Sequence, residues 1–194
     1  MTPNNDRELA ARAVRGDGQA FGELIQRYQG VVFNVAYRMM ANAPDAEDVT
    51  QETFIRAYRA FSSYDPERPI GAWFKTIAVR VCLTFLSSDS HEAFSLDEER
   101  QSPVQPTTGD PFQKETDPEE LAQMGERDHS VRQAIIALPP QYRAVIELRH
   151  FQELSYEDIA QTLHCPVGVV KITLFRARRM LAERLAGMQK SERS

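Results

Sequence analysis

The chain has 194 residues, of which 42% are apolar, and a formal net charge of −5. This length and apolar share predict one large or two small folded domains and exclude a wholly disordered chain. The apolar runs span only a few residues, and the amino terminus lacks the basic and apolar parts of a signal peptide. We therefore expect a cytoplasmic location and no insertion into a membrane.

Helix signals fill the first 86 residues. Asp6 and Asp17 can each act as an N-cap, and Pro44 is followed by acidic residues that favour the first turn of a helix. After a turn-rich loop at residues 62–69, apolar residues recur at helical spacing from Ile70 onwards. The sequence predicts helices at residues 6–15, 17–40, 44–61 and 70–86.

A flexible acidic linker is predicted at residues 87–117. Residues 87–128 carry 12 acidic and 3 basic side chains, against 10 and 10 in residues 1–86 and 6 and 10 in residues 129–194. Proline, glycine, serine and threonine are frequent in the linker, and apolar periodicity is weak. A plain spacer is the simplest interpretation. Such a chain reaches about 100 Å when stretched, so it could hold two domains apart on a large partner.

Helix signals return after the linker. Asp117 is a candidate N-cap that is followed by a proline and two glutamates, and this helix ends before Pro139. Residues 141–150 form one more helix. The predicted fold is all-α, with two small helical domains at residues 1–86 and 118–194.

The most informative stretch, residues 154–178, is typical of a helix-turn-helix. Ser155 and Asp158 form a capping-box pattern at the start of its first helix, and Pro166 ends that helix. Apolar residues then recur at spacings of three and four, which predicts an inward-facing stripe. The stripe consists of Val167, Val170, Leu174, Ala177 and Leu181.

The opposite face of the second helix is the candidate DNA-reading surface, because a basic helix presented in this way can enter the major groove. An ordinary helical hairpin with a solvated basic face is the alternative interpretation. The DNA-binding candidates on this helix are Gly168, Val169, Lys171, Ile172, Thr173, Arg176 and Arg179.

Catalytic and metal-binding patterns are not found in the sequence. Cys82 and Cys165 stand far apart without a CxxC pair, which predicts buried thiols in a reducing compartment, and His164 beside Cys165 is only weak evidence for a metal. No Ser/His/Asp arrangement or Gly-rich phosphate loop is present. We expect no cofactor, no metal and no enzymatic activity.

Five short motifs precede the helix-turn-helix, at residues 16–24 (GDGQAFGEL), 45–58 (DAEDVTQETFIRAY), 61–66 (FSSYDP), 72–78 (AWFKTIA) and 138–149 (LPPQYRAVIELR). In this order they resemble the extracytoplasmic-function (ECF) sigma factors, which are small bacterial transcription initiation factors. The resemblance covers essentially the whole chain. It implies a subunit that binds core RNA polymerase, reads the minus-ten and minus-thirty-five elements of promoter DNA, and is held inactive by an anti-sigma factor.

The helix at residues 44–61 alternates an acidic and polar surface with buried positions, which by itself indicates only a solvated helix face. The resemblance makes this face the surface that docks on a coiled coil of the polymerase clamp. The assigned polymerase-binding residues are Asp45, Asp48, Gln51, Glu52 and Ile55.

The loop at residues 62–69 and the next helix combine aromatic rings with cations, which suits single-stranded nucleic acid because bases stack on the rings. Tyr64 and Trp73 can equally be core residues, and we assign Trp73 mainly to packing. The resemblance implies that the loop captures a flipped base of the melted minus-ten element. The DNA-binding candidates here are Ser63, Tyr64, Asp65, Lys75 and Arg80.

The sequence departs from the family pattern at two DNA-contacting places. Residues 86–91 replace a basic run at the end of the first domain, and Val169 with Ile172 and Thr173 replace the usual Thr and Ser-Arg of the recognition helix. Fewer phosphate contacts would lower the affinity for DNA. Alternatively, Val169 and Ile172 contact thymine methyl groups and shift the specificity.

Two other functions fit the same residues. The chain could be a helix-turn-helix regulator that acts without polymerase, although such regulators usually bind as dimers and no dimerisation heptad is evident. It could also be a protein-interaction module with a degenerate DNA face. Promoter-dependent transcription with core polymerase separates these functions from that of a sigma factor.

Overall fold

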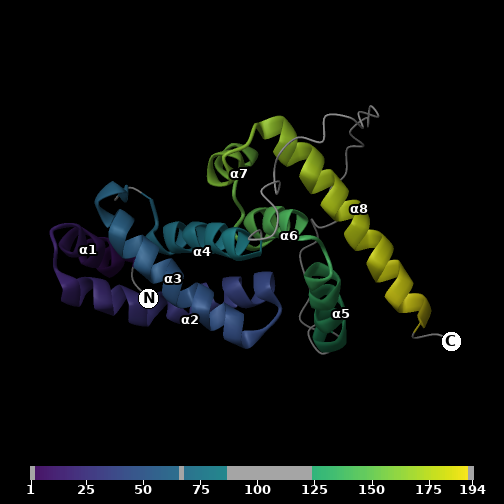
Figure 1. Ribbon diagram of the computed structural model, residues 1–194, viewed down its shortest axis with the longest axis horizontal. Helices are drawn as coiled ribbons and strands as arrows, with labels where there is room; N and C mark the ends of the chain where they lie inside the picture. Colours follow the sequence, from purple (N-terminus) through teal and green to yellow (C-terminus); the bar gives the residue numbers. More distant parts are fainter. Residues whose placement is uncertain (1–2, 66–67, 87–123, 192–194) are drawn as a thin grey trace.

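The computed structural model describes residues 3–65, 68–86 and 124–191, and all regular elements within these ranges are helical (Figure 1). This confirms the predicted all-α fold. The helices form two bundles that pack against each other. We call α1 to α4 the first bundle and α5 to α8 the second bundle.

The first bundle consists of α1 (Pro3–Val14), α2 (Gly18–Met40), α3 (Ala43–Ala60), the 3₁₀ turn η1 (Phe61–Ser63) and α4 (Ile70–Leu86). Helix α2 packs against α1, α3 and α4. As predicted, Asp17 caps α2, because its Oδ1 accepts hydrogen bonds from the backbone N–H groups of Gln19 and Ala20. The predicted cap at Asp6 is wrong. Helix α1 already begins at Pro3, and the Asp6 carboxylate instead accepts hydrogen bonds from Arg27 and Tyr28 of α2.

The second bundle consists of α5 (Met124–Ile136), α6 (Pro140–Ile146), the π-helical turn η3 (Glu147–Phe151), α7 (Tyr156–Leu163) and α8 (Val167–Ser191). The helix predicted at residues 141–150 is confirmed, but it changes from α to π geometry at Glu147. The predicted linker at residues 87–117 and the predicted N-cap at Asp117 lie outside the described residues.

Helices α7 and α8 form the predicted helix-turn-helix. The Ser155 Oγ caps α7 by accepting a hydrogen bond from the Asp158 backbone N–H at 3.0 Å. The chain leaves α7 through His164, whose φ of 52° lies in the left-handed region, and Pro166 then precedes α8. The inward stripe of α8 is confirmed by the burial of Val170, Leu174, Ala177 and Leu181, while Val167 is half-buried.

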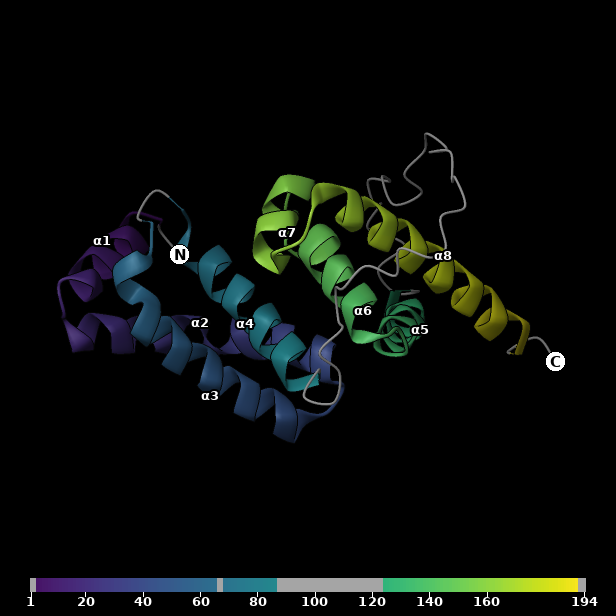
Figure 2. The same ribbon diagram turned by 45° about the horizontal axis from the view of Figure 1, so that its top comes forward.

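The two bundles meet through α2 and α4 on one side and α5, α6 and α7 on the other (Figure 2). Helix α4 contacts α2 and α3 of its own bundle as well as α6 and α7. It therefore buries most of its apolar residues, including Phe74, Ala78, Val79 and Cys82. Among the described helices, none has the length and apolar character that a membrane crossing requires.

Candidate functional site

The outward face of α8 is open to solvent. Gly168, Lys171 and Ile172 are exposed, and the Ile172 side chain reaches 55% exposure although it is apolar. Val169, Thr173 and Arg176 are half-buried on the flanks of the same face. Because the buried stripe holds α8 on the opposite side, the predicted reading residues share one accessible surface.

The cations of α8 differ in their surroundings. Arg179 lies 3.7 Å from the Glu183 carboxylate one turn later, in an exposed ion pair. Arg178 lies within 3.5 Å of the His150 ring. Lys171 stands next to the exposed Ile172, so a positive charge and an apolar group adjoin on the candidate reading surface.

A second candidate surface follows α3, and we call it the α3 face. Asp48, Gln51 and Ile55 are exposed at helical spacing, as the sequence predicts for this face. The half-buried Glu52 accepts a hydrogen bond from Arg56 at 2.7 Å. Asp45 accepts one from the Asn42 side chain, which in turn caps the helix.

Sequence reasoning missed one member of the α3 face. Tyr58 is 63% exposed and lies three residues after Ile55, so it extends the apolar end of this face. The regular spacing from Ile55 to Tyr58 could have identified it. Together these residues form a strip with acidic and amide groups at one end and apolar groups at the other.

The loop after α3 differs from the prediction at Tyr64. Its ring is only 6% exposed and lies 5.6 Å from the Phe61 ring and 5.2 Å from the Trp73 ring, between centroids. Its hydroxyl donates a hydrogen bond to the Arg68 carbonyl, and burial raises the pKa of this phenol. In this structure the ring is therefore part of the core and presents no face on which a base could stack. The assignment of Trp73 to packing agrees with these contacts.

Other predicted residues of this loop remain at the surface. Ser63 is exposed and donates a hydrogen bond to the Ala60 carbonyl, and Asp65 is exposed 3.9 Å from Arg68. Lys75 is half-buried on α4. The structure thus brings Ser63 and Asp65 to one loop, with the buried Tyr64 between them.

The Arg80 guanidinium is hydrogen-bonded to backbone carbonyls of the second bundle. Its guanidinium donates to the carbonyls of Thr162 and Gln161 at 2.6 and 3.1 Å, both at the end of α7. Burial lowers the pKa of this guanidinium. The prediction that Arg80 contacts a DNA phosphate is not met in this conformation, because the α7 carbonyls hold its donors.

Within residues 3–65, 68–86 and 124–191, no three or more His, Cys, Asp or Glu side chains cluster in a way that could hold a metal ion. Cys82 is buried as predicted, and burial raises the pKa of its thiol to about 12. Cys165 is only half-buried, because it lies in the turn between α7 and α8.

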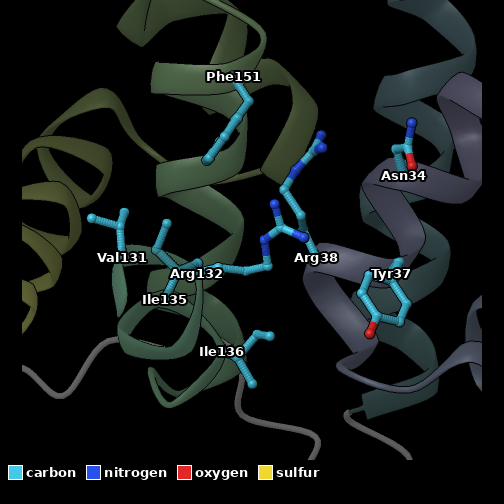
Figure 3. Close-up of a pocket in the computed structure, with 8 residues that line it drawn as sticks. All are labelled: Asn34, Tyr37, Arg38, Val131, Arg132, Ile135, Ile136 and Phe151. Atoms are coloured by element: carbon cyan, nitrogen blue, oxygen red, sulfur yellow. The ribbon is translucent and has the colours of Figure 1, made fainter. Parts of the chain in front are cut away.

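A cavity of about 290 Å³ lies between the bundles (Figure 3). Its α5 side carries Val131, Ile135 and Ile136, and its α2 side carries Tyr37 and Arg38. Asn34, Arg132 and Phe151 complete the lining. The α5 wall is therefore mainly apolar, although Arg132 also belongs to it, and the α2 wall is polar.

Two family matches cover most of the described structure. The sequence matches Sigma-70 region 2 over residues 24–92 and region 4 of Sigma-70 over residues 128–181. The first match includes α3, the following loop and α4, and the second includes the helix-turn-helix. Both candidate surfaces therefore lie inside matched regions.

Known proteins resemble the chain over nearly its full length. RNA polymerase sigma-H factor of Pseudomonas aeruginosa is 33% identical, over 95% of this chain and 96% of that protein. The ECF RNA polymerase sigma-E factor of Haemophilus influenzae is also 33% identical, over 93% and 95%. The solved structure of CnrH in complex with the cytosolic domain of CnrY is 27% identical, with a TM-score of 0.58 over 94% of this chain and 98% of that chain. On this evidence the chain belongs to the ECF group of the sigma-70 family.

Proposed function

We propose that the protein is a dissociable specificity subunit of RNA polymerase, which binds the core enzyme and directs it to promoters. The observation that carries the proposal is the presence of regions 2 and 4 in one short chain, each with an accessible candidate surface. The proposed domains are residues 1–86 and 118–194, joined by the acidic linker. In this role the protein works in the cytoplasm and performs no chemistry itself.

The α3 face is the proposed polymerase contact. Asp48, Gln51 and Ile55 project into solvent, so a partner can reach them without unfolding the bundle. An acidic and amide surface suits a basic partner helix, since charge complementarity speeds and orients association. The exposed Tyr58 supplies a large apolar contact of the kind that anchors interfaces.

The outward face of α8 is the proposed reader of the minus-thirty-five element. Lys171 can reach a guanine edge or a phosphate, and the exposed methyl groups of Ile172 can contact thymine. We propose that the loop of Ser63 and Asp65, held by the buried Tyr64, approaches the minus-ten element together with Lys75 of α4. This arrangement divides promoter reading between the two bundles.

Regulation by a protein inhibitor is part of the proposal. The related CnrH is solved with the cytosolic domain of CnrY bound to it. We propose that an anti-sigma factor likewise binds this chain and limits its access to polymerase.

Charge reversal on the α3 face tests the function. Asp48→Lys with Glu52→Lys should abolish co-purification with core polymerase and promoter-directed transcription, while helical content by circular dichroism stays unchanged. A control with the same charge change, Glu8→Lys with Glu157→Lys, alters exposed residues elsewhere and should retain both activities. Wild-type polymerase binding by the Asp48 and Glu52 variant would overturn the docking assignment.

A further inference from the structure

Tyr28 of α2 lies where three helices of the first bundle meet. Its hydroxyl donates a hydrogen bond at 2.7 Å to one carboxylate oxygen of Asp6 on α1. The other Asp6 oxygen accepts a hydrogen bond from the Arg27 guanidinium at 2.8 Å, so α2 engages both oxygens of this carboxylate. The Tyr28 ring also packs near Phe74 of α4, with 5.6 Å between the ring centres. The side chain is therefore held by α1 at its hydroxyl and borders α4 with its ring.

The chemistry of the Tyr28 hydroxyl keeps this hydrogen bond in place at neutral pH. Burial raises the pKa of the phenol, and the hydrogen bond to Asp6 raises it further. The phenol therefore stays protonated and continues to donate. The Asp6 side chain is only 19% exposed, and a hydrogen bond to an ionised acceptor is stronger than one between neutral groups. The ring thus has one preferred position.

The start of α4 leaves no room for a side chain beside this ring. Gly71 is the second residue of α4, and a Cβ atom added to it would lie 2.5 Å from Cε1 of Tyr28. Such a distance is too short for two carbon atoms, so Gly71→Ala requires either the ring or the first turn of α4 to move. At Gly30 of α2, by contrast, an added Cβ would meet no neighbouring group within 4 Å. The backbone of α4 therefore touches a ring that α1 holds.

The first turn of α4 is joined to the candidate minus-ten loop. The Trp73 backbone N–H donates to the Pro69 carbonyl at 3.2 Å, which links the end of the loop to the helix. The Trp73 ring lies 5.2 Å from the Tyr64 ring, between centroids. Tyr64 stands between Ser63 and Asp65, the two exposed residues of the loop. A displacement of this turn would therefore be passed on to both of them.

We propose that Tyr28 is a positioning residue for recognition of the minus-ten element, and that its contact with Gly71 sets the place of the first turn of α4. Asp6 holds the ring against this turn, and the turn holds the loop that carries Ser63 and Asp65. Tyr28 acts through the loop and makes no contact with DNA itself. This role rests on the proposed function, because the position of the loop affects transcription only in a protein that reads promoters.

Promoter opening by the complex with core polymerase tests this role. Gly71→Ala should slow opening roughly tenfold, because a small misplacement of a positioned group is costly. Its affinities for core polymerase and for a minus-thirty-five duplex should stay at the wild-type level. Gly30→Ala is the matched control, since the same substitution on α2 meets no neighbouring group and should leave opening unchanged. Wild-type opening by Gly71→Ala would overturn the proposal.

A double variant distinguishes positioning from a general loss of stability. Tyr28→Phe removes the hydrogen bond to Asp6 and should slow opening only about threefold, as expected for one hydrogen bond. In Gly71→Ala with Tyr28→Phe, the released ring can move away from the added methyl group. Opening should then recover to within about twofold of Tyr28→Phe alone, because substitutions in direct contact are not additive. Losses that simply add would contradict the coupling.

Hydrogen exchange of the free chain supplies a measurement that needs no polymerase. The amides of Tyr64 and Trp73 donate to the Phe61 and Pro69 carbonyls, so their exchange rates report on the loop and on the first turn of α4. Gly71→Ala should accelerate exchange at these two amides and leave the rates in α3 unchanged. The double variant should slow exchange again. Equal acceleration throughout the first bundle would indicate a general loss of stability and overturn the positioning role.

The two measurements separate this role from the function on which it rests. If the wild type does not open promoters but exchange at Tyr64 and Trp73 responds as described, the proposed function falls and the coupling between Tyr28 and Gly71 stands. If the wild type opens promoters and Gly71→Ala does so equally well, the function stands and the positioning role falls.

Discussion

The two bundles have chemically different cores. In the first bundle the rings of Phe21, Phe54, Phe61, Trp73 and Phe74 contact one another at centroid distances between 5.1 and 6.4 Å. The core of the second bundle is aliphatic and includes Leu138, Leu148, Ile159, Val170 and Leu174. Aromatic rings pack around the loop after α3, whereas a simple aliphatic stripe holds α8.

The predicted DNA-binding residues of the two bundles also differ in how far they are exposed to solvent. In the first bundle, aromatic packing buries Tyr64, and the junction with α7 engages Arg80. In the second bundle, the aliphatic stripe occupies only one side of α8 and leaves Lys171 and Ile172 exposed. An aromatic residue beside a loop is thus a weaker indicator of solvent exposure than a residue on a helix face opposite a clear apolar stripe.

The largest expected effect is on the aromatic core. Phe74→Ala should lower the free energy of unfolding of the first bundle by about 3–5 kcal/mol, because it removes a buried ring and leaves a cavity. The single tryptophan, Trp73, lies in this bundle, so its fluorescence during urea denaturation reports the change. Leu174→Ala should cost about 2–5 kcal/mol in the second bundle, seen by circular dichroism.

The same pair of variants also tests whether the two bundles unfold independently. If Leu174→Ala shifts the Trp73 transition as strongly as Phe74→Ala does, the two bundles unfold as one cooperative unit despite their different cores. A smaller shift of the Trp73 transition supports two bundles that unfold as separate units.

The next effect concerns the reading surface of α8. Lys171→Ala should weaken binding of the protein to a minus-thirty-five duplex by about 1–3 kcal/mol, as expected for loss of a base or phosphate contact. Fluorescence anisotropy at two salt concentrations measures the change. Glu183→Gln is a control on the same helix that removes an exposed acidic group and should not weaken binding.

A variant of the same face should instead bind DNA more tightly. Ile172→Ser with Thr173→Arg restores the family pattern and adds a cation, so the slope of affinity against salt should steepen by about one unit. No change in the slope would indicate that this face does not meet phosphates. A protein-interaction role for α8 would then be favoured.

A smaller effect is expected at Tyr64. Tyr64→Phe removes the hydrogen bond to the Arg68 carbonyl and should cost about 0.5–1.5 kcal/mol of stability, measured by thermal denaturation. Promoter opening, followed with permanganate at permissive temperature, should remain at the wild-type level. A loss of opening without a loss of stability would place the hydroxyl at the DNA and contradict its structural role.

The smallest expected effect is a difference in thiol reactivity between Cys82 and Cys165. The thiolate is the reactive form, and burial raises the pKa of Cys82 to about 12, so little thiolate forms at neutral pH. Iodoacetamide at about pH 8 should therefore modify the half-buried Cys165 first, as peptide mass spectrometry can show. Equal modification of both thiols in the folded protein would show that α4 is less protected than its burial indicates.

Local patterns along the chain predicted most of the helices, the helix-turn-helix and the sides of α3 and α8 that face solvent. Caps such as those by Asp17 and Ser155 and the stripe from Val170 to Leu181 involve residues only a few positions apart, so their physics is readable along the chain. The family motifs added the order of the two regions. The caps at Asp17 and Ser155 and the apolar stripe of α8 concern local geometry, and the structure confirms them.

The side chains at the junction between the bundles depend on tertiary packing and could not be predicted from local patterns. Arg38 and Glu147 are separated by 109 residues, Arg143 and Met39 by 104, and Arg80 and Thr162 by 82. No local sequence pattern distinguishes an arginine that binds the end of a distant helix from an arginine that faces water or a phosphate. The burial of Tyr64 was decided in the same way, because it depends on rings brought together from η1 and α4.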